Sequence, residues 1–402
     1  MLDKLIFVIN CGSSSLKFKI IDPIKKKTLL FGLAENFHNN NSIIKWNFNE
    51  KKKKIKFYNK ITHKFILNYL VEKILKKNLL YDSIIGIGHR IVHGGEKFIN
   101  SVLITDTVLE EIKKASIFAP LHNPIQVIGV KEMKKILPHL KNKQVAVFDT
   151  AFHQTIPIKS YLYALPIIFY KKYKIRRYGA HGTSHKYVTQ IAAKFLNIKL
   201  HNFNCISCHL GNGSSITAIN NGKSIDTSMG LTPLEGLVMG TRCGNIDPAI
   251  IFYMFNELNF DMDTIYNILT KKSGMLGLTN ITSDFRYIEE NYFKNNDIKI
   301  ATDVFIHNLT KYIASYSVLM NNKIHAIIFT GGIGENSTLI REKTIKKLKI
   351  LNFFIDKKLN NIFKYGKIGL ISTNFSIPII VIPTNEELMI SQETFKIIYK
   401  IK

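Results

Sequence analysis

The chain has 402 residues, of which 46% are apolar, and its formal net charge at neutral pH is +27. The length suits two domains of ordinary size, and the apolar content is too high for a disordered protein. No apolar run approaches the roughly 18 residues of a membrane-spanning helix, and residues 5–9 are too short for the core of a signal peptide. We therefore expect a folded two-domain protein in the cytoplasm, without a membrane partner.

The predicted elements, taken in chain order, form two similar series. In the first half, residues 5–9 and 16–20 predict a β-hairpin, residues 62–77 a helix, and residues 84–91 and 146–148 two further strands. In the second half, residues 203–208 and 216–219 predict a second hairpin, followed by a tight turn at 221–222. Residues 304–320 predict a helix, residues 326–329 and 379–382 two strands, and residues 384–398 the closing helix. The two hairpins look like one element used twice, and we place the boundary between the halves near residue 150.

The lysine run at residues 51–54 is the clearest basic cluster of the chain. Clustered lysines can bind nucleic acid by releasing counterions from its phosphates. This run has no interleaved aromatic residues and follows a polar stretch at 39–41, which is also typical of a solvated loop or of a strand edge. Because no recognition motif accompanies the charge, we expect no nucleic-acid partner.

Three loops of small residues, each after an apolar run, lie far apart in the chain, at 10–15, 210–215 and 331–336. Backbone N–H groups in such loops can wrap a phosphate, and the missing side chains let the backbone come close. One such loop would be weak evidence. Three loops spread over both halves predict a nucleotide held in a cleft between two lobes.

Three other patterns resemble known sites but lack what those sites need. Residues 205–209 spell C-x-x-C-H, yet this run leads into a glycine loop and no second cysteine pair could complete a zinc site. Residues 181–185 hold two histidines without the glutamate of a metalloprotease, and residues 222–224 resemble the end of a P-loop whose first glycine is replaced by Thr217. We therefore expect reduced cysteines, with no haem and no Walker-type loop.

Arginine is rare in this lysine-rich chain, which has only six. A guanidinium grips carboxylate or phosphate with a planar fork that lysine cannot reproduce, so we expect arginine where that geometry is needed. Arg341 is the exception, for which an ordinary surface ion pair is a plausible interpretation. The other five lie beside glycine or histidine clusters: Arg90, Arg176, Arg177, Arg242 and Arg286.

These charged groups suit phosphoryl transfer, whose transition state spreads negative charge over the phosphoryl oxygens. The arginines and His181 would neutralise that charge. Lys17, one strand beyond the first loop, could reach a bound phosphate, although a lysine extending from a turn is an equally simple interpretation. Asp149, at a strand end, and Glu386 would help to position Mg²⁺ for ATP.

Four segments of the chain, residues 8–17, 88–95, 147–154 and 383–388, resemble the acetate kinase family of the acetate and sugar kinase, Hsp70 and actin superfamily. The resemblance runs nearly from end to end. It implies an α/β fold of two actin-like (ribonuclease H-like) domains with a central cleft. Residues 1–149 plus 386–402 would form the N-terminal domain, and residues 150–385 the C-terminal, nucleotide-binding domain. It also implies ATP as co-substrate, Mg²⁺ as cofactor with Mn²⁺ as the alternative, and a homodimer.

The resemblance assigns roles by position. Catalytic roles fall to Asp149, His181 and Arg242. The substrate carboxylate would be held by Arg90, and its methyl group by Val92, Leu121 and Pro233. The magnesium-associated residues would be Asn10 and Glu386. The nucleotide would contact Lys17, His209, Leu210, Gly211, Asn212, Gly213, Asp284, Phe285, Arg286, Gly332, Ile333, Gly334, Glu335 and Asn336.

The implied activity is the reversible, ATP-dependent phosphorylation of acetate to acetyl phosphate with release of ADP, by direct in-line transfer. A propionate kinase is the close alternative, since one methylene is worth only about 1–3 kcal/mol in an apolar pocket. An ATP-switched binding protein of the Hsp70 or actin kind would share the loops but has no need for arginine and histidine around a small pocket. Three residues depart from those expected in the family, which bears on fine specificity more than on activity: Ala180, Cys243 and Asn245.

Overall fold

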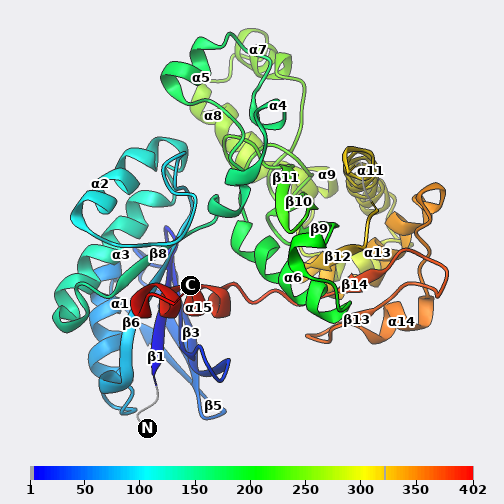
Figure 1. Ribbon diagram of the computed structural model, residues 1–402. Helices are drawn as coiled ribbons and strands as arrows, with labels where there is room; N and C mark the ends of the chain where they lie inside the picture. Colours follow the sequence, from blue (N-terminus) through cyan, green and yellow to red (C-terminus); the bar gives the residue numbers. More distant parts are fainter. Residues whose placement is uncertain (1–3, 321–322, 402) are drawn as a thin grey trace. The chain divides into compact units, whose positions relative to one another are not determined.

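The computed structural model describes residues 4–320 and 323–401, and the chain divides into two compact units. Unit 1 comprises Met1–Ala151 and Asn385–Lys402, and unit 2 comprises Phe152–Thr384. Each unit is built on one β-sheet with helices packed against it (Figure 1). The predicted α/β class is therefore confirmed.

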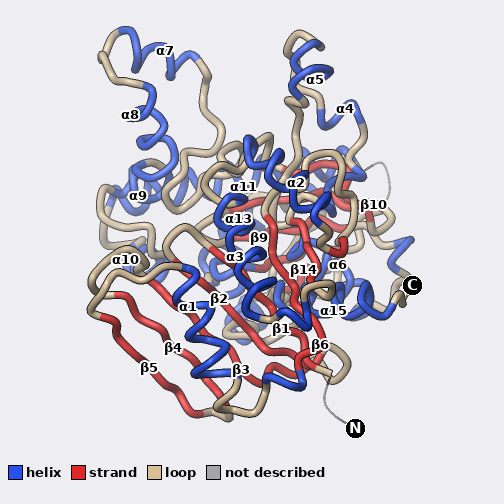
Figure 2. Tube along the Cα trace, turned by 90° about the vertical axis from the view of Figure 1, so that its left-hand side faces the viewer, coloured by secondary structure: helices blue, strands red, loops and turns tan. Residues whose placement is uncertain are grey.

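The eight-stranded sheet of unit 1 has the order β5-β4-β3-β2-β1-β6-β8-β7. Its strands are β1 (Leu5–Cys11), β2 (Ser15–Asp22), β3 (Lys27–Glu35), β4 (Ser42–Phe48), β5 (Lys51–Phe57), β6 (Ile84–Ile91), β7 (Val102–Leu103) and β8 (Gln144–Phe148). The predicted hairpin is confirmed as the antiparallel pair β1–β2, and β6 and β8 extend the sheet in parallel. The lysine run lies in β5 at the edge of the sheet, which confirms the strand-edge interpretation (Figure 2).

One face of this sheet packs against α1 (His63–Tyr69), its π-helical continuation η1 (Leu70–Leu75) and α3 (Asn123–Ile136). Together, α1 and η1 confirm the helix predicted at 62–77. This helix begins after Thr62, whose hydroxyl accepts a hydrogen bond from the N–H of Phe65. The other short helices of unit 1 are η2 (Tyr81–Ser83), α2 (Asp106–Lys114), η3 (Ala115–Phe118) and η4 (Pro138–Leu140).

The opposite face of the sheet is covered by α15 (Glu386–Tyr399), the predicted closing helix (Figure 1). This helix lies directly on β6, because Gly86 and Gly88 place no side chain between them. A Cβ atom at Gly86 would collide with Ile398, and one at Gly88 would lie 2.5 Å from Thr394 Oγ1. Since side chains two residues apart share a face of a strand, Arg90 points to the same side as the two glycines.

The six-stranded sheet of unit 2 has the order β11-β10-β9-β12-β14-β13. Its strands are β9 (Cys205–Leu210), β10 (Ser214–Asn220), β11 (Lys223–Thr227), β12 (Ala326–Thr330), β13 (Gly369–Leu370) and β14 (Ile379–Val381). An antiparallel hairpin is again followed by two parallel strands. The order β10-β9-β12-β14 repeats β2-β1-β6-β8 of unit 1, which confirms that one element is used twice.

Helices pack on both faces of the unit 2 sheet. Ile328 of β12 packs in the core that holds α6, whereas Phe329 faces the core that holds α11. Helix α11 begins earlier than the predicted residue 304, because Asn295 Oδ1 caps it by accepting the N–H of Ile298 at 3.0 Å. The helices are η5 (Ala151–Thr155), α4 (Ile158–Tyr161), α5 (Ile168–Tyr173), α6 (Gly182–Phe195), η6 (Leu200–Asn202), α7 (Ala249–Asn256), α8 (Met262–Asn267), η7 (Ile268–Lys272), α9 (Gly274–Thr279), α10 (Phe285–Asn291), α11 (Asn296–Leu319), α12 (Gly331–Asn336), α13 (Thr338–Lys346), η8 (Lys349–Leu351) and α14 (Lys357–Ile362).

The third glycine segment differs from the prediction, because residues 331–336 form helix α12 rather than a loop. The chain turns from β12 into this helix at Gly331, whose φ is +76°. The backbone of Gly331 also lies close to β9. A Cβ atom there would lie 2.6 Å from the carbonyl oxygen of Leu210. Only glycine fits this turn without strain.

Arg341 does not form the surface ion pair suggested for it, because its side chain is fully buried. Its guanidinium donates hydrogen bonds to the carbonyl oxygens of Gly334 at 2.9 Å and Glu335 at 2.7 Å, and to Oδ1 of Asn360 at 2.7 Å. The last carbonyl groups of a helix lack partners within it. Arg341 therefore completes the C-terminal end of α12 and fixes the glycine segment in place.

The cysteines are reduced, as predicted, and all four are free. Cys205 packs in the core beside α6, whereas Cys208 packs in the core on the other face of the sheet. Because the two thiols point to opposite sides of β9, they cannot share a metal ion or a haem. No helix in the described part of the chain is long and apolar enough to cross a membrane.

Candidate active site

Unit 1 gathers charged side chains where β6 and β8 end and α15 begins. These strands are parallel neighbours, so Arg90 of β6 and Asp149 after β8 lie at the same edge of the sheet. The Arg90 guanidinium donates to both carboxylate oxygens of Asp149, with Nη2 2.7 Å from Oδ2 and Nε 3.1 Å from Oδ1. Oε2 of Glu386, in the first turn of α15, lies 3.9 Å from Nη1 of Arg90.

Burial shapes the charges of this cluster, since Asp149 is only 1% exposed. Burial raises the pKa of Asp149, and the Arg90 guanidinium opposes that shift. Burial also lowers the pKa of Arg90, but the carboxylates of Asp149 and Glu386 overcome this and hold it above its ordinary value. Two carboxylates thus face one permanent cation, which leaves an excess of negative charge.

The cluster suits Mg²⁺, which is commonly bound through one or two carboxylates together with waters and substrate phosphates. The described residues contain no group of three histidine, cysteine, aspartate or glutamate side chains that could enclose a metal ion. Among the residues that the structure describes, Glu386 makes only its long contact with Arg90, so its carboxylate retains acceptor capacity. The residues therefore fit a metal ion that brings most of its own ligands.

The other site residues predicted in unit 1 lie on neighbouring elements. Asn10 and Lys17 are directly opposite each other in the β1–β2 hairpin. Val92 is nearly buried, and its N–H donates to Gln126 Oε1 at 3.0 Å, whereas Leu121 is 48% exposed. Sequence reasoning missed one contact in this region.

That contact is made by His63, which holds the first glycine loop. Its Nε2 lies 2.7 Å from the carbonyl oxygen of Gly12. The signal in the sequence is weak, because a single histidine at the start of a helix has no characteristic pattern. The contact joins the loop after β1 to the first residue of α1.

Unit 2 brings His181, His209 and Arg242 together around the second glycine loop. The rings of His181 and His209 are stacked with centroids 4.3 Å apart. A Cβ atom at Gly213 would lie 3.4 Å from Nε2 of His181 and 3.5 Å from Nη1 of Arg242. Because Gly213 has no side chain, His181 and Arg242 stay accessible to a ligand bound at this loop.

Arg242 is a partly buried cation without a carboxylate partner among the described residues. Its Nη1 donates to the carbonyl oxygen of Pro233 at 3.0 Å and contacts the sulfur of Met239 at 3.7 Å. Burial lowers its pKa, and no neighbouring carboxylate opposes this shift. Since withdrawing a charge from water without a counter-charge is unfavourable even in part, this guanidinium is well placed to receive an anion.

A hydrogen-bonded chain of histidines and serines runs behind His181. Ser215 Oγ lies 2.9 Å from Nδ1 of His181 and 2.8 Å from Nε2 of His185, whose Nδ1 lies 2.9 Å from Ser207 Oγ. Burial lowers the pKa of His185 well below its ordinary value, so this ring is neutral and carries one proton. Because Ser215 has one hydroxyl proton to donate, the ring nitrogens on its two sides cannot both be bare acceptors. The tautomers of His181 and His185 are therefore coupled.

The neighbouring arginines, Arg176 and Arg177, make contacts within unit 2. Arg177 donates to Glu235 Oε1 at 2.7 Å and to the carbonyl oxygen of Thr227 at 2.9 Å. Arg176 stacks on Tyr161, with its guanidinium carbon 3.6 Å from the ring centroid. Both interactions stabilise the fold, and the charge-neutralising role expected for these two arginines stays a prediction.

A cavity of about 620 Å³ in unit 2 is lined by the ends of three predicted nucleotide segments. This size lies within the range of about 300–1,000 Å³ that is usual for ligand pockets. The predicted residues on its wall are Gly211, Asn212, Asp284, Phe285, Arg286, Gly332, Ile333 and Asn336. Sequence reasoning missed Lys364 and Tyr365, an exposed cation–aromatic pair that also lines the cavity.

The remaining predicted nucleotide residues lie elsewhere. Leu210 is fully buried in the core, and Gly334 packs against β12 and β9. Glu335 Oε1 accepts the N–H groups of Gly331 and Thr384, each at 3.1 Å, so its carboxylate joins the start of α12 to the end of unit 2. Lys17 belongs to unit 1.

Of the three residues that depart from the family pattern, Asn245 has a clear structural role. Its Oδ1 accepts the N–H of Gly236 at 2.8 Å, and its Nδ2 donates to the hydroxyl of Tyr312 at 2.7 Å. Its amide donates to the tyrosine hydroxyl, whereas an ionised aspartate at this position could only accept a hydrogen bond from that hydroxyl. This residue braces the turn that carries Arg242.

Comparison with known proteins gives matches over almost the whole chain. The model of the acetokinase family matches residues 5–392. An acetate kinase of Escherichia coli (strain K12) is 54% identical over 398 residues, covering 99% of this chain and 100% of the relative. Among solved structures, a propionate kinase from Francisella tularensis subsp. tularensis SCHU S4 is 45% identical with a TM-score of 0.92, covering 97% of this chain and 98% of that one. An acetate kinase from Porphyromonas gingivalis is 38% identical, also with a TM-score of 0.92, covering 98% and 99%.

Replacing Ser215 by alanine should uncouple the two histidines. We expect the ¹⁵N signals of His181 Nδ1 and His185 Nε2 to shift together in Ser215→Ala, since both lose the same hydroxyl partner. Ser214→Ala is the matched control, because Ser214 Oγ donates only to the carbonyl oxygen of Gly211 within the described residues. Unchanged histidine signals in Ser215→Ala would contradict the coupling.

Proposed function

Because the chain belongs to the acetokinase family, we propose that it phosphorylates acetate with ATP, producing acetyl phosphate and ADP in a reversible reaction. The observation that carries this proposal is the partly buried Arg242 guanidinium, which lies beside His181 and a glycine loop and has no carboxylate partner among the described residues. Such an arrangement favours the negative charge of a phosphoryl group in flight.

Unit 2 would hold the nucleotide. The cavity between residues 284–286 and α12 is large enough for a ligand of that class, and Tyr365 offers an aromatic face at its wall. Backbone N–H groups of the second glycine loop would lie along the phosphates. His181 and Arg242 would stabilise the migrating phosphoryl group. Residues 150–385 would thus act as the nucleotide-binding domain.

Unit 1 would hold the carboxylate substrate, so that residues 1–149 plus 386–402 form the second functional domain. Arg90 is fixed by Asp149 and still carries donor groups for a small carboxylate. Val92 and Leu121 from unit 1, with Pro233 from unit 2, are the residues proposed to contact the substrate methyl group. The proposal requires both units to act on one pair of reactants.

The reaction needs no general base, because a small carboxylic acid with a pKa of roughly 4 to 5 is already ionised at neutral pH. We therefore assign Asp149 to positioning Arg90 and the metal ion rather than to removing a proton. Asn10 and Glu386 would hold the Mg²⁺, with Mn²⁺ as the alternative. When bound, the ion would neutralise charge on the phosphate oxygens.

A homodimer is part of the proposal and is supported by exposed apolar side chains on unit 2. Helix α7 is almost entirely apolar, yet none of its residues is buried, and Phe252 is 65% exposed. Large exposed apolar patches on soluble proteins mark interaction sites. The second copy is the proposed cover because obligate homodimer interfaces are rich in such residues. A cytoplasmic location is likewise proposed, in keeping with four free cysteines.

A substrate series tests the activity. With ATP and Mg²⁺, we expect ADP release and a hydroxylamine-trapped acyl phosphate, with kcat/KM for acetate about 10-fold or more above that for propionate, and lower still for butyrate. A higher value for propionate would favour a propionate kinase. Failure to trap any acyl phosphate would favour the ATP-switched binding protein instead.

An Asp149→Asn variant tests the unit 1 cluster. The amide keeps the shape of the carboxylate but loses its charge, so Arg90 and the metal ion lose their anchor. We expect kcat/KM to fall about 100-fold or more, while circular dichroism is unchanged. Asp106→Asn, at an exposed ion pair with Lys134, is the control and should keep full activity. Full activity in Asp149→Asn would rule out its assigned role.

The proposed dimer is tested by charging α7. We expect light scattering to give a dimer for the unmodified protein and a monomer for Phe252→Glu combined with Phe255→Glu, since burying two carboxylates in an interface is unfavourable. Phe293→Glu, at an aromatic side chain 80% exposed elsewhere on unit 2, is the control and should remain dimeric. A monomeric unmodified protein would disprove this assignment.

A further inference from the structure

The outer half of the unit 1 sheet has an open face of which the proposed reaction uses only Lys17, at one end. The strand register places two rows of side chains across β2, β3, β4 and β5 on this face: Lys17, Leu33, Lys45 and Lys54, and Lys19, Phe31, Asn47 and Lys52. Neighbours in sequence, such as Phe18 and Trp46, point instead into the core. We call the hollow over the two rows the lysine trough.

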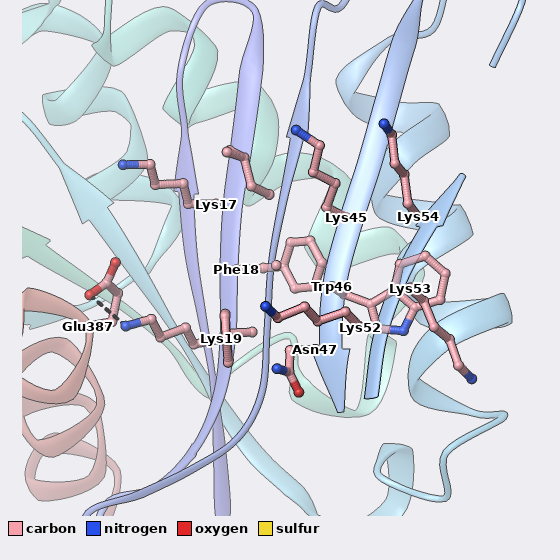
Figure 3. Close-up of a pocket in the computed structure, with 13 residues that line it drawn as sticks. Lys17, Phe18, Lys19, Lys45, Trp46, Asn47, Lys52, Lys53, Lys54 and Glu387 are labelled. Atoms are coloured by element: carbon pink, nitrogen blue, oxygen red, sulfur yellow. Dashed lines mark hydrogen bonds and ion pairs between the residues drawn. The ribbon is translucent and has the colours of Figure 1, made fainter. Parts of the chain in front are cut away.

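Figure 3 shows how the lysine trough is arranged. Lys17 and Lys19 rise from β2 on one side, and Lys45 and Lys54 rise from β4 and β5 on the other. Glu387 from the first turn of α15 lies at the β2 side, where it contacts Lys19. The cavity volume is about 510 Å³, which suits a small organic ligand.

The charge of the trough is mostly uncompensated. The two rows contain five lysines, and within the described residues two of these form ion pairs, Lys19 with Glu387 at 3.1 Å and Lys45 with Glu35 at 3.2 Å. Within the described part of the chain, the other three make no hydrogen bond or ion pair: Lys17, Lys52 and Lys54.

Two of the ammonium groups also oppose each other, because Lys45 and Lys54 are direct cross-strand partners. Like charges in this arrangement destabilise a sheet. An anion bound between them would remove that repulsion.

The floor of the trough is apolar. Leu33 and Phe31 of β3 form this floor, and Phe31 is 48% exposed. An inorganic anion would leave this floor bare. A molecule that satisfies both parts of the site must carry an apolar body as well as negative charge.

We propose that the lysine trough binds a small amphipathic organic anion, namely a phosphate or carboxylate that carries an acyl or aromatic body. The body lies along β3 on Phe31 and Leu33, and the anionic group is held by lysines from β4 and β5. A flat bilayer fits less well, because the apolar floor is recessed between rows of lysine side chains. Nucleic acid is also disfavoured, since the floor offers only one aromatic ring for stacking.

Calorimetric titration with octyl phosphate, kept below its micelle concentration, tests this site on the full chain. We expect octyl phosphate to bind about 10-fold more tightly than inorganic phosphate or octanol. The paired variant Lys45→Gln with Lys54→Gln should weaken binding about 10-fold, because two charge contacts are lost. Phe31→Thr should weaken it by a similar factor.

The matched control is Lys60→Gln with Lys64→Gln, which removes two exposed lysines of the same unit outside the trough. It should bind octyl phosphate like the unmodified protein, and acetyl phosphate formation should be unchanged in every variant. Equal weakening by the control, or full affinity in both trough variants, would overturn the proposal. Binding to phosphatidylglycerol vesicles without binding to monomeric octyl phosphate would also overturn it and identify a membrane surface.

Discussion

The charge arrangement of unit 1 depends on the ion pair between Arg90 and the buried Asp149. Removing two charges from water is unfavourable unless close geometry and further hydrogen bonds compensate. The parallel ends of β6 and β8 supply that geometry, with contacts of 2.7 and 3.1 Å. Arg242 in unit 2 has the opposite surroundings. Among the described residues, it contacts the Pro233 carbonyl group and the Met239 thioether but no carboxylate. One arginine is thus held in place by the fold, and the other is left to be neutralised by a ligand.

Much of the fold could be predicted because its main signals are local. Apolar alternation and turn residues identified both hairpins, and helical periodicity identified α15. The nature of residues 331–336 could not be predicted in this way. Whether glycines after a strand form a loop or a helix depends here on the Leu210 carbonyl and on Arg341, which contact the segment from other parts of the chain. Arg341 was misread as a surface residue because its acceptors, the Gly334 and Glu335 carbonyl groups and the Asn360 side chain, come together only when α12, α13 and α14 pack.

Residues of the candidate site could be predicted where their type suits a specific chemistry. Residues that act by holding other side chains in position were harder to predict. His181 and Arg242 were singled out beside glycines, and the structure brings them together. Their catalytic roles, like those of the other assigned residues, stay predictions. Ser215 and His185 were missed, because a serine shared by two rings becomes visible only when β10 and α6 are packed. The ion pair of Arg177 was also missed, since its carboxylate partner lies far along the sequence.

The position of α15 has a consequence for how the protein is made. This helix covers the face of β6 that Gly86 and Gly88 leave bare, yet it follows the whole of unit 2 in the chain. On the ribosome, unit 2 is one continuous stretch and can begin to fold while the first sheet still lacks its cover. The first sheet is therefore begun early and completed late, so the nascent chain must keep an apolar surface from aggregating while more than half of its length is translated.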